Sequence, residues 1–377
     1  MGETVVVIGA GVSGLTTALL LSRDRANDVT VVAKHMPGDY DIEYASPFAG
    51  AAVMPMGTTE EERHWEAASW AELKRICEEV PEAGLCFQSN TPHSTRLHDG
   101  QLGRCRFPRR IKDQALSTTP KGPFAPEPWF ATIFEDFREL PAAEVPRGYD
   151  SACEFTSVCI NTAIYLPWLV GQLVKNGAQL KRAVVRDIRE AKHLSHTGRT
   201  ASLIVNASGL GALKMGGVRD ASMYPARGQV VVVRSEVDSM VLASGTDDGP
   251  SDAVYAMKRA AGGGTILGGT FEVDNWESQP DPSTALRIMS RIVEANPAIA
   301  DGKGVAGLSV VRHCVGLRPY RKGGARVEEE KLDDETWVVH NYGHGGWGYQ
   351  GSYGCAKSVV DLIAKVQEKR RSSRAKL

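Results

Sequence analysis

The stretch "VVVIGAGVSGLTTALLLS", from Val5 to Ser22, decides the fold of this chain. It begins with an apolar, β-branched run that is typical of a strand buried in a parallel sheet. Gly9, Gly11 and Gly14 follow in the GxGxxG register, and the remaining residues have helical spacing. Together with the apolar run "DVTVVA" at residues 28–33, the stretch predicts a strand–helix–strand unit of about 30 residues.

The three glycines indicate that this unit binds a dinucleotide. One allows the tight turn, one lets a pyrophosphate approach the backbone N–H groups, and one lets the helix pack on the strand. The acidic residue that usually ends the second strand is missing, because Lys34 and His35 stand there. This departure weakens a simple NAD interpretation. Lys34 either faces a ribose or phosphate or is a solvated strand end.

Length and composition bound the class of protein. The 377 residues predict two domains or one large one, and 42% hydrophobic with 24% charged residues is typical of a soluble globular chain. A formal charge of -1 favours neither nucleic acid nor a membrane surface as partner. The longest apolar run is interrupted by glycines and hydroxyl residues, so we do not expect a membrane span. The sequence shows neither the basic start nor the cleavage site of a signal peptide, so we do not expect one.

The cysteines favour isolated thiols over a disulfide framework or a zinc site. None of the seven forms a CxxC pair, which favours free thiols in a reducing compartment. A bridge from Cys77 to Cys86 or to Cys105 is the alternative that the spacing leaves open.

Several later segments indicate that the nucleotide-binding domain is interrupted. Residues 160–188 predict a helix that ends at Gly177 and then a strand, and residues 202–212 predict a buried strand that leaves through glycines. The stretch "VVHNYGHGGWGYQGSYGCA", residues 338–356, adds a strand, a glycine-rich turn and a helix. Residues 226–275 instead alternate as antiparallel strands.

We therefore expect an α/β fold with two interleaved domains. The first is a Rossmann-type dinucleotide-binding domain built from residues 1–55, 146–225 and 305–377. The second is an α+β substrate-binding domain with a mostly antiparallel sheet, built from residues 56–145 and 226–304.

Seven motifs in order resemble the D-amino-acid oxidase family of FAD-dependent amine oxidases, and its fungal members most closely. They are "VVVIGAGVSGL", "ASPFAGAAVMP" (45–55), "VNASGLGA" (205–212), "ARGQVVVV" (226–233), "GGTFEVDNW" (268–276), "VGLRPYR" (315–321) and the C-terminal glycine-rich stretch. The resemblance covers nearly the whole chain, and it implies FAD buried between two domains.

The resemblance assigns contacts with FAD to residues in six segments. They are Gly9, Gly11, Val12, Ser13, Gly14, Lys34, His35, Ser46, Ala49, Gly50, Val184, Ser208, Gly209, Gly345, Gly346, Gly348, Tyr349 and Gln350.

Arg318 is the sharpest candidate for substrate binding. An amino acid brings a carboxylate into a partly dry pocket. The permanently charged, bidentate guanidinium of arginine binds it there better than the single ammonium group of lysine. The resemblance adds the Tyr255 hydroxyl as a second donor to this carboxylate, the Gly346 carbonyl as acceptor for the amine, and Gln350 as holder of a water. Mammalian-type members carry another tyrosine four residues before Tyr255, where this chain has Ser251, so we expect a different lid.

The resemblance also implies the reaction. A hydride passes from Cα of a D-amino acid to N5 of FAD, dioxygen then takes the electrons to give hydrogen peroxide, and the imino acid hydrolyses to a 2-oxo acid and ammonia. Ala52 and Met54, near the expected position of the substrate side chain, are neutral and favour neutral or apolar D-amino acids. D-Aspartate oxidation is the alternative, with Arg96, His98 or Arg259 as the second cation.

Three other interpretations come from single features. GxGxxG alone is compatible with an NAD(P)-dependent dehydrogenase or with a non-enzymatic dinucleotide-binding sensor, but neither explains "GLRP" or the second glycine turn. His340 and His344 have the spacing of a helical metal pair, but the glycines between and after them argue against a helix. We therefore expect no metal site.

The chain ends in "AKL", which fits a peroxisomal address of the SKL type. We accordingly expect a peroxisomal location, with the import receptor as a partner beside the D-amino acid and dioxygen. A second copy of the chain in a homodimer is also considered as a partner.

Overall fold

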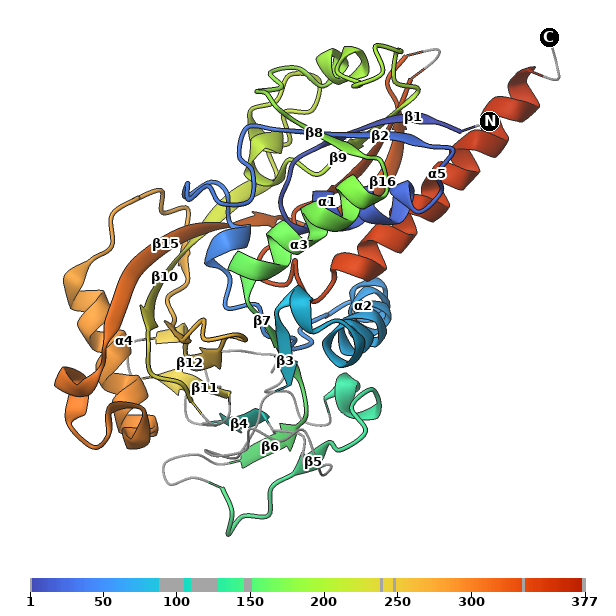
Figure 1. Cartoon of the computed structure of the whole chain (residues 1–377). Helices are drawn as coiled ribbons and strands as arrows, with labels where there is room; N and C mark the ends of the chain where they lie inside the picture. The colour runs from blue at the N-terminus through green and yellow to red at the C-terminus, as the bar shows by residue number, and fades with distance from the viewer. Residues whose placement is uncertain are drawn as a thin grey trace.

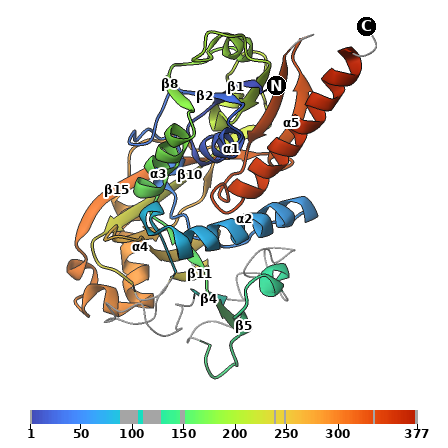
Figure 2. The same cartoon turned by 45° about the vertical axis from the view of Figure 1, so that its right-hand side comes forward.

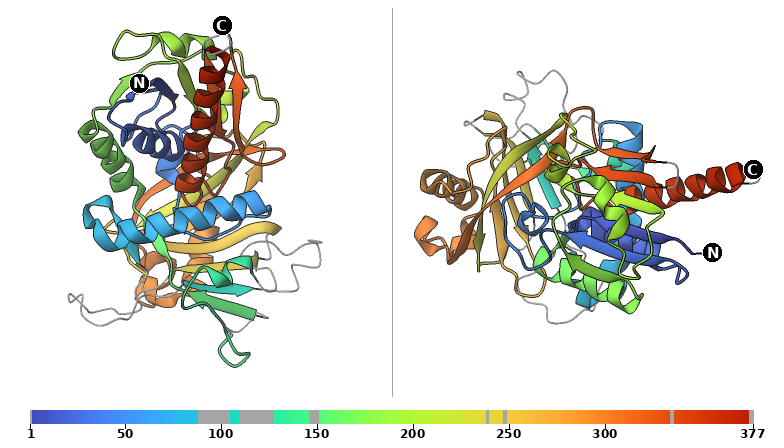
Figure 3. Two further views of the ribbon diagram at one scale, coloured as in Figure 1. Left: turned by 90° about the vertical axis from the view of Figure 1, so that its right-hand side faces the viewer. Right: turned by 90° about the horizontal axis from the view of Figure 1, so that it is seen from above.

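Two sheets organise the chain in the computed structural model, which describes residues 2–87, 105–109, 128–145, 151–237, 240–246, 249–333 and 336–374. Figure 1 shows a six-stranded sheet in the upper half of the molecule and a nine-stranded sheet in the lower half. This arrangement confirms the predicted α/β class. Seen from above, both termini lie on the same side (Figure 3).

The six-stranded sheet has the order β16-β17-β9-β1-β2-β8. Its strands are β1 (Thr4–Ile8), β2 (Asp28–Ala33), β8 (Gln179–Arg182), β9 (Leu203–Asn206), β16 (Arg326–Lys331) and β17 (Trp337–Tyr342). β1 is buried along its whole length between two parallel neighbours, β2 and β9. Burial on both faces explains why its sequence is apolar without alternation.

Three helices cover one face of this sheet. They are α1 (Val12–Ser22), α3 (Thr162–Lys175) and α5 (Ser352–Arg374), and α1 packs against the other two. α1 begins directly after Gly11, whose extended backbone turns the chain out of β1. α3 ends before Gly177, which has a positive φ of 85°, as the sequence predicts.

The nine-stranded sheet has the order β14-β10-β13-β12-β11-β4-β6-β5, with β15 paired to β10. Its strands are β4 (Cys105–Arg109), β5 (Arg138–Glu139), β6 (Ser151–Phe155), β10 (Met223–Val233), β11 (Val241–Thr246), β12 (Gly249–Lys258), β13 (Thr265–Gly268), β14 (Glu272–Val273) and β15 (Val310–Arg321). α4 (Pro282–Ala295) buries Ile288 and Ile292 in a core with Val231 and Leu267 of this sheet.

A small sheet and one helix lie between the two large sheets. The small sheet pairs β3 (Leu85–Phe87) with β7 (Val158–Ile160). α2 (Glu60–Glu79) begins with a capping box between Thr59 and Glu62 and packs on α5 and β3. Figure 2 shows α2 running beneath α5 and above β11, β4 and β5 of the nine-stranded sheet.

Two strands of the nine-stranded sheet come from segments that were expected to build the other domain. β6 and β15 fall in segments expected to build the FAD-binding domain, but both pair within the nine-stranded sheet. β15 does so because it pairs with β10 along nearly its whole length. The predicted segment limits therefore do not coincide with the sheets at residues 151–155 and 310–321.

Cys77 and Cys86 carry free thiols, so the bridge between them does not form. The side chain of Cys105, the other considered partner, lies outside the described residues. Among the described helices, none combines the length and hydrophobicity that a bilayer crossing requires.

Candidate active site

Two adjoining cavities lie where the two sheets meet. The first, of about 530 Å³, follows the carboxyl ends of β1, β2 and β17, and the second, of about 330 Å³, lies against β10, β12 and β15. Six residues line both cavities: Val12, Ser13, Ala45, Ser46, Pro319 and His344. The shared wall makes one elongated site, and its place at the carboxyl ends of parallel strands is where α/β sheets bind ligands.

The glycines after β1 shape the first cavity by their lack of a side chain. A Cβ on Gly9 would lie 2.3 Å from the carbonyl oxygen of Ala207, and one on Gly14 would lie 2.0 Å from that of Gly9. Gly9 and Gly11 line the cavity, whereas Gly14 lets α1 pack against the turn. The N-terminus of α1 is thereby brought to the cavity, where its N–H groups suit an anion.

Two buried polar groups line the first cavity. The Ser208 hydroxyl and Nε2 of His35 are buried and make no hydrogen bond to the described residues, although Nε2 lies 3.7 Å from Oδ1 of Asp41. Both residues line this cavity, as do Lys34, Val184 and Gly209. Because buried polar groups are nearly always satisfied, a polar ligand is expected here.

Arg318 points its charge into the second cavity. It lies on β15, its Nη1 donates to the carbonyl oxygen of Thr270 at 3.1 Å, and its guanidinium carbon lies 5.9 Å from the ring centre of Phe271. A Cβ on Gly228 would lie 2.4 Å from Nη1, so this glycine makes room for the side chain. Within the described ranges, no carboxylate forms an ion pair with Arg318, which leaves it free for an anionic ligand.

Tyr255 contributes a hydroxyl to the same cavity. On β12 it pairs with Gly268 of β13, and a Cβ on that glycine would lie 2.3 Å from the phenol oxygen. The ring therefore lies against the Gly268–Gly269 backbone, and the residue lines the cavity together with Arg318.

The C-terminal glycine-rich turn forms another wall of the second cavity. Gly345, Gly346, Gly348 and Gln350 line it, and the Tyr349 hydroxyl donates to the carbonyl oxygen of Ser46 at 2.9 Å. Ala49 and Gly50 complete the predicted residues that line this cavity. Trp347 lies outside the described lining of both cavities and stacks on Trp65, with ring centres 6.1 Å apart, so it braces the turn.

The Gln350 amide is hydrogen-bonded at both ends. Its Oε1 accepts from the Met54 N–H at 3.0 Å, and its Nε2 donates to Glu66 at 2.8 Å. Glu66 is buried and also accepts from the N–H groups of Met56 and Gly57. Burial raises the pKa of the Glu66 carboxyl to about 7. Gln350 therefore braces residues 54–57, and its second amide N–H and second carbonyl lone pair stay available for the expected water.

Sequence reasoning missed Glu66, although a visible signal exists. It lies on the side of α2 that also buries Trp65, Ser69 and Trp70, and a carboxylate at such a position requires donors. Phe271 and Tyr320 were missed as lining residues, although each lies inside a quoted motif.

The two histidines have separate hydrogen-bond partners. His344 contacts Ser13 through Nδ1 and Asn341 Oδ1 through Nε2, and its burial lowers its pKa to about 4. His340 contacts Asn206 and Glu330. With both ring nitrogens of each imidazole engaged, the pair does not form a metal site.

Arg259, one of the cations considered for an acidic substrate, does not line the second cavity among the described residues. Nη2 of Arg259 donates to the Ala49 carbonyl at 3.0 Å and to Thr162 Oγ1 at 3.1 Å, so this buried guanidinium is used within the fold. Arg96 and His98 lie outside the described residues.

The chain is similar to known proteins in sequence and in fold. The model of the DAO family, described as FAD dependent oxidoreductase, matches residues 4–362. The chain is 61% identical over 372 residues to a D-amino-acid oxidase from Fusarium vanettenii, with 99% of each chain covered. It is 30% identical to a D-aspartate oxidase from Talaromyces thermophilus, with 96% of this chain and 95% of that one covered. The solved structure of glycine oxidase from Geobacillus kaustophilus shares the fold, with a TM-score of 0.72 at 18% identity over 96% of this chain and 95% of that one.

Proposed function

Because the chain belongs to the DAO family of FAD-dependent oxidoreductases, we propose that it oxidises neutral D-amino acids to 2-oxo acids, ammonia and hydrogen peroxide. The observation that carries this proposal is Arg318, a cation without a carboxylate partner among the described residues. It faces a cavity that adjoins the glycine loop of a dinucleotide site.

The first cavity fits FAD. Its glycine loop would meet the pyrophosphate, and the unsatisfied Ser208 hydroxyl and His35 imidazole would meet polar atoms of the cofactor. Gly345, Gly346 and Gly348 would leave room for the flavin end, where the cavities join. When bound, FAD supplies the acceptor for the hydride that leaves Cα and passes two electrons to dioxygen.

Three groups of the second cavity would hold the amino acid. Arg318 would bind the carboxylate with its fork, the Tyr255 hydroxyl would donate to the same carboxylate, and the Gly346 carbonyl would accept from the amine. Three fixed points direct the Cα–H of only one enantiomer toward the first cavity. These residues therefore act by orientation.

The described lining offers no general base for the α-proton. His344 is its only imidazole, and this imidazole stays neutral with both nitrogens hydrogen-bonded. The reaction therefore suits an amine bound in its neutral form and a Cα–H that leaves as hydride.

The lining favours a neutral substrate side chain. Ala52, Met54, Leu242, Met257 and Phe271 are apolar, and Arg318 is the one guanidinium or ammonium group in the described lining. A D-aspartate oxidase needs a second cation for the second carboxylate. That requirement separates the two activities.

Substrate comparison tests the proposal. The purified yellow protein is given D-alanine, D-phenylalanine, D-aspartate and L-alanine, and peroxide formation is measured together with oxygen uptake. We expect turnover of both neutral D-amino acids, slow turnover of D-aspartate and none of L-alanine. A strong preference for D-aspartate would overturn the substrate assignment. Absence of peroxide with every D-amino acid would overturn the oxidase assignment.

The proposal extends to a peroxisomal location. The terminal "AKL" fits an import address, and confining the enzyme in this compartment would contain its peroxide. Fluorescently tagged full-length chain should co-localise with a peroxisomal marker, and a chain lacking residues 375–377 should not. Equal distribution of the two chains would rule out the address.

A further inference from the structure

The two faces of β10 have different surroundings. Gly228 and Val230 line the substrate cavity, whereas the alternate residues Arg227 and Gln229 point to the reverse face. Both side chains there are buried, with Arg227 3% exposed and Gln229 0% exposed. A guanidinium charge therefore lies directly behind the wall of the substrate cavity, where it is costly unless it is fully paired.

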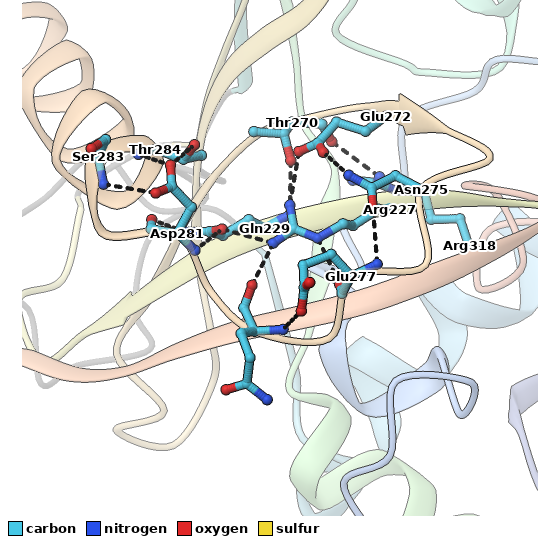
Figure 4. Close-up of polar contacts among 11 residues, drawn as sticks. Arg227, Gln229, Thr270, Glu272, Asn275, Glu277, Asp281, Ser283, Thr284 and Arg318 are labelled. Atoms are coloured by element: carbon cyan, nitrogen blue, oxygen red, sulfur yellow. Dashed lines mark hydrogen bonds and ion pairs between the residues drawn. The ribbon is translucent and has the colours of Figure 1, made fainter.

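Arg227 is paired on every side. Its Nη1 donates to Glu272 at 2.8 Å, and its Nη2 donates to Gln229 Oε1 at 3.1 Å. Nε and Nη2 also donate to the carbonyl oxygens of Glu277 and Gln279, each at 2.8 Å. Figure 4 shows Arg227 at the centre of these contacts, with Arg318 to one side.

Gln229 holds the end of the loop formed by residues 272–281, which Arg227 also contacts. Its Oε1 accepts from the Asp281 N–H at 2.8 Å, and its Nε2 donates to the Asp281 carbonyl at 2.7 Å. Asp281 in turn caps α4 by accepting from the Thr284 N–H at 2.7 Å. The loop at residues 272–281 is thus held to β10 from end to end.

Thr270 connects this network to the substrate site. The Gln229 N–H donates to the Thr270 hydroxyl at 2.8 Å, and the Thr270 carbonyl accepts from Nη1 of Arg318 at 3.1 Å. Thr270 is 3% exposed and stands two residues before Glu272, the carboxylate that Arg227 pairs. The position of the carbonyl that holds Arg318 therefore depends on the contacts behind the sheet.

We propose that Arg227 is a positioning residue that directs Arg318 toward the substrate carboxylate. It fixes Glu272, which stands two residues after Thr270, and Gln229, whose N–H donates to the Thr270 hydroxyl. The Thr270 carbonyl sets the direction of the Arg318 guanidinium. This inference rests on the proposed function, because it concerns the same substrate carboxylate. Arg227 itself touches no substrate.

The first test replaces Arg227 with a neutral side chain of similar length. In the FAD-loaded enzyme, R227M should lower kcat/KM for D-alanine about tenfold, mainly by raising KM, as expected when a hydrogen bond to a charged group is misaligned. Flavin content should stay at the wild-type level. R227K keeps the charge without the fork and should recover part of the loss.

A matched control separates positioning from general destabilisation. R138M removes an arginine at the opposite edge of the same sheet that donates to the buried Glu154 at 2.6 Å. It should lower Tm without changing KM. If R138M and R227M shift KM equally, the positioning role is refuted.

A double-mutant cycle tests whether Arg227 affects substrate binding through Arg318. If Arg227 acts through Arg318, R227M should raise KM about tenfold in the wild type but less than about twofold in an R318K background. An equal rise in KM in both backgrounds would show that Arg227 does not act through Arg318.

Thr270 provides a second test should R227M fail to fold. T270V removes only the hydroxyl that the Gln229 N–H meets and leaves the ion pair in place, and it should raise KM in the same way. A wild-type KM for T270V would refute the proposal while leaving the oxidase activity standing. Absence of D-alanine turnover by the wild type would instead refute the proposed function.

Discussion

Gly228 leaves the space that the guanidinium of Arg318 occupies. A Cβ on this glycine would lie 2.4 Å from Nη1 and 2.6 Å from both Cζ and Nη2. The contact joins neighbouring strands, because Gly228 of β10 pairs with Gly316 of β15, two residues before Arg318. The direction of the substrate-binding side chain therefore depends on a missing methyl group.

We predict that G228A displaces Arg318 and raises KM for D-alanine by about 10- to 100-fold, since small misplacements of binding groups are costly. FAD content should not change, because Gly228 is not among the residues expected to contact FAD and lies outside the first cavity. G171A is the matched control, as a Cβ on Gly171 in α3 meets nothing within 4 Å. Steady-state kinetics and the flavin spectrum check both variants, and a wild-type KM for G228A would contradict the geometry.

Removing the charge of Arg318 should separate flavin binding from turnover. R318A is expected to stay yellow and lose turnover, because the Arg318 side chain is not among the groups expected to contact FAD and lies outside the first cavity. R318K should keep weak activity with a KM raised about 100-fold, since lysine supplies the charge without the bidentate fork. Initial rates with D-alanine over a wide concentration range distinguish the two. Retained wild-type activity in R318A would remove this residue from the substrate site.

The glycine turn after β1 makes a separate prediction. G14V places a Cβ 2.0 Å from the Gly9 carbonyl oxygen, so α1 cannot approach the turn and its N-terminus moves away from the pyrophosphate. We expect loss of bound FAD and reduced expression of folded protein. The flavin-to-protein absorbance ratio after purification is the measurement. A full complement of FAD in G14V would refute the proposed phosphate site.

Local patterns made the first sheet predictable. The apolar run of β1, the GxGxxG turn and Gly177 after α3 act within a few residues, so the sequence predicts the elements that they begin or end. β15 is different, because its place in the nine-stranded sheet depends on pairing with β10, roughly ninety residues earlier in the chain. No local pattern encodes such a partner.

The candidate site likewise contains residues that local motifs predict and contacts that they do not. Arg318 and Tyr255 were predicted from motifs, and the structure places both in one cavity. The partners that hold a residue in place were not predictable, because Glu66 meets Gln350 from 284 positions away in the sequence. Arg227 was part of a quoted motif, but its bonds to backbone carbonyls depend on a loop path that no pattern specifies.

Glu66 should make stability depend on pH. Its folded-state pKa of about 7 is above the ordinary value of 4.5, so the folded protein holds this proton more tightly than the unfolded chain does. The contribution to stability is complete below pH 4.5 and is lost as the pH rises through 7, by on the order of 3 kcal/mol.

E66Q removes this titration, so the stability of the wild type relative to E66Q should fall between pH 5 and 8. Denaturant unfolding of the FAD-loaded proteins at four pH values measures the difference. E61Q, which changes an exposed carboxylate on the same helix, should follow the wild type, whereas parallel curves for E66Q and wild type would show that Glu66 does not titrate in this range.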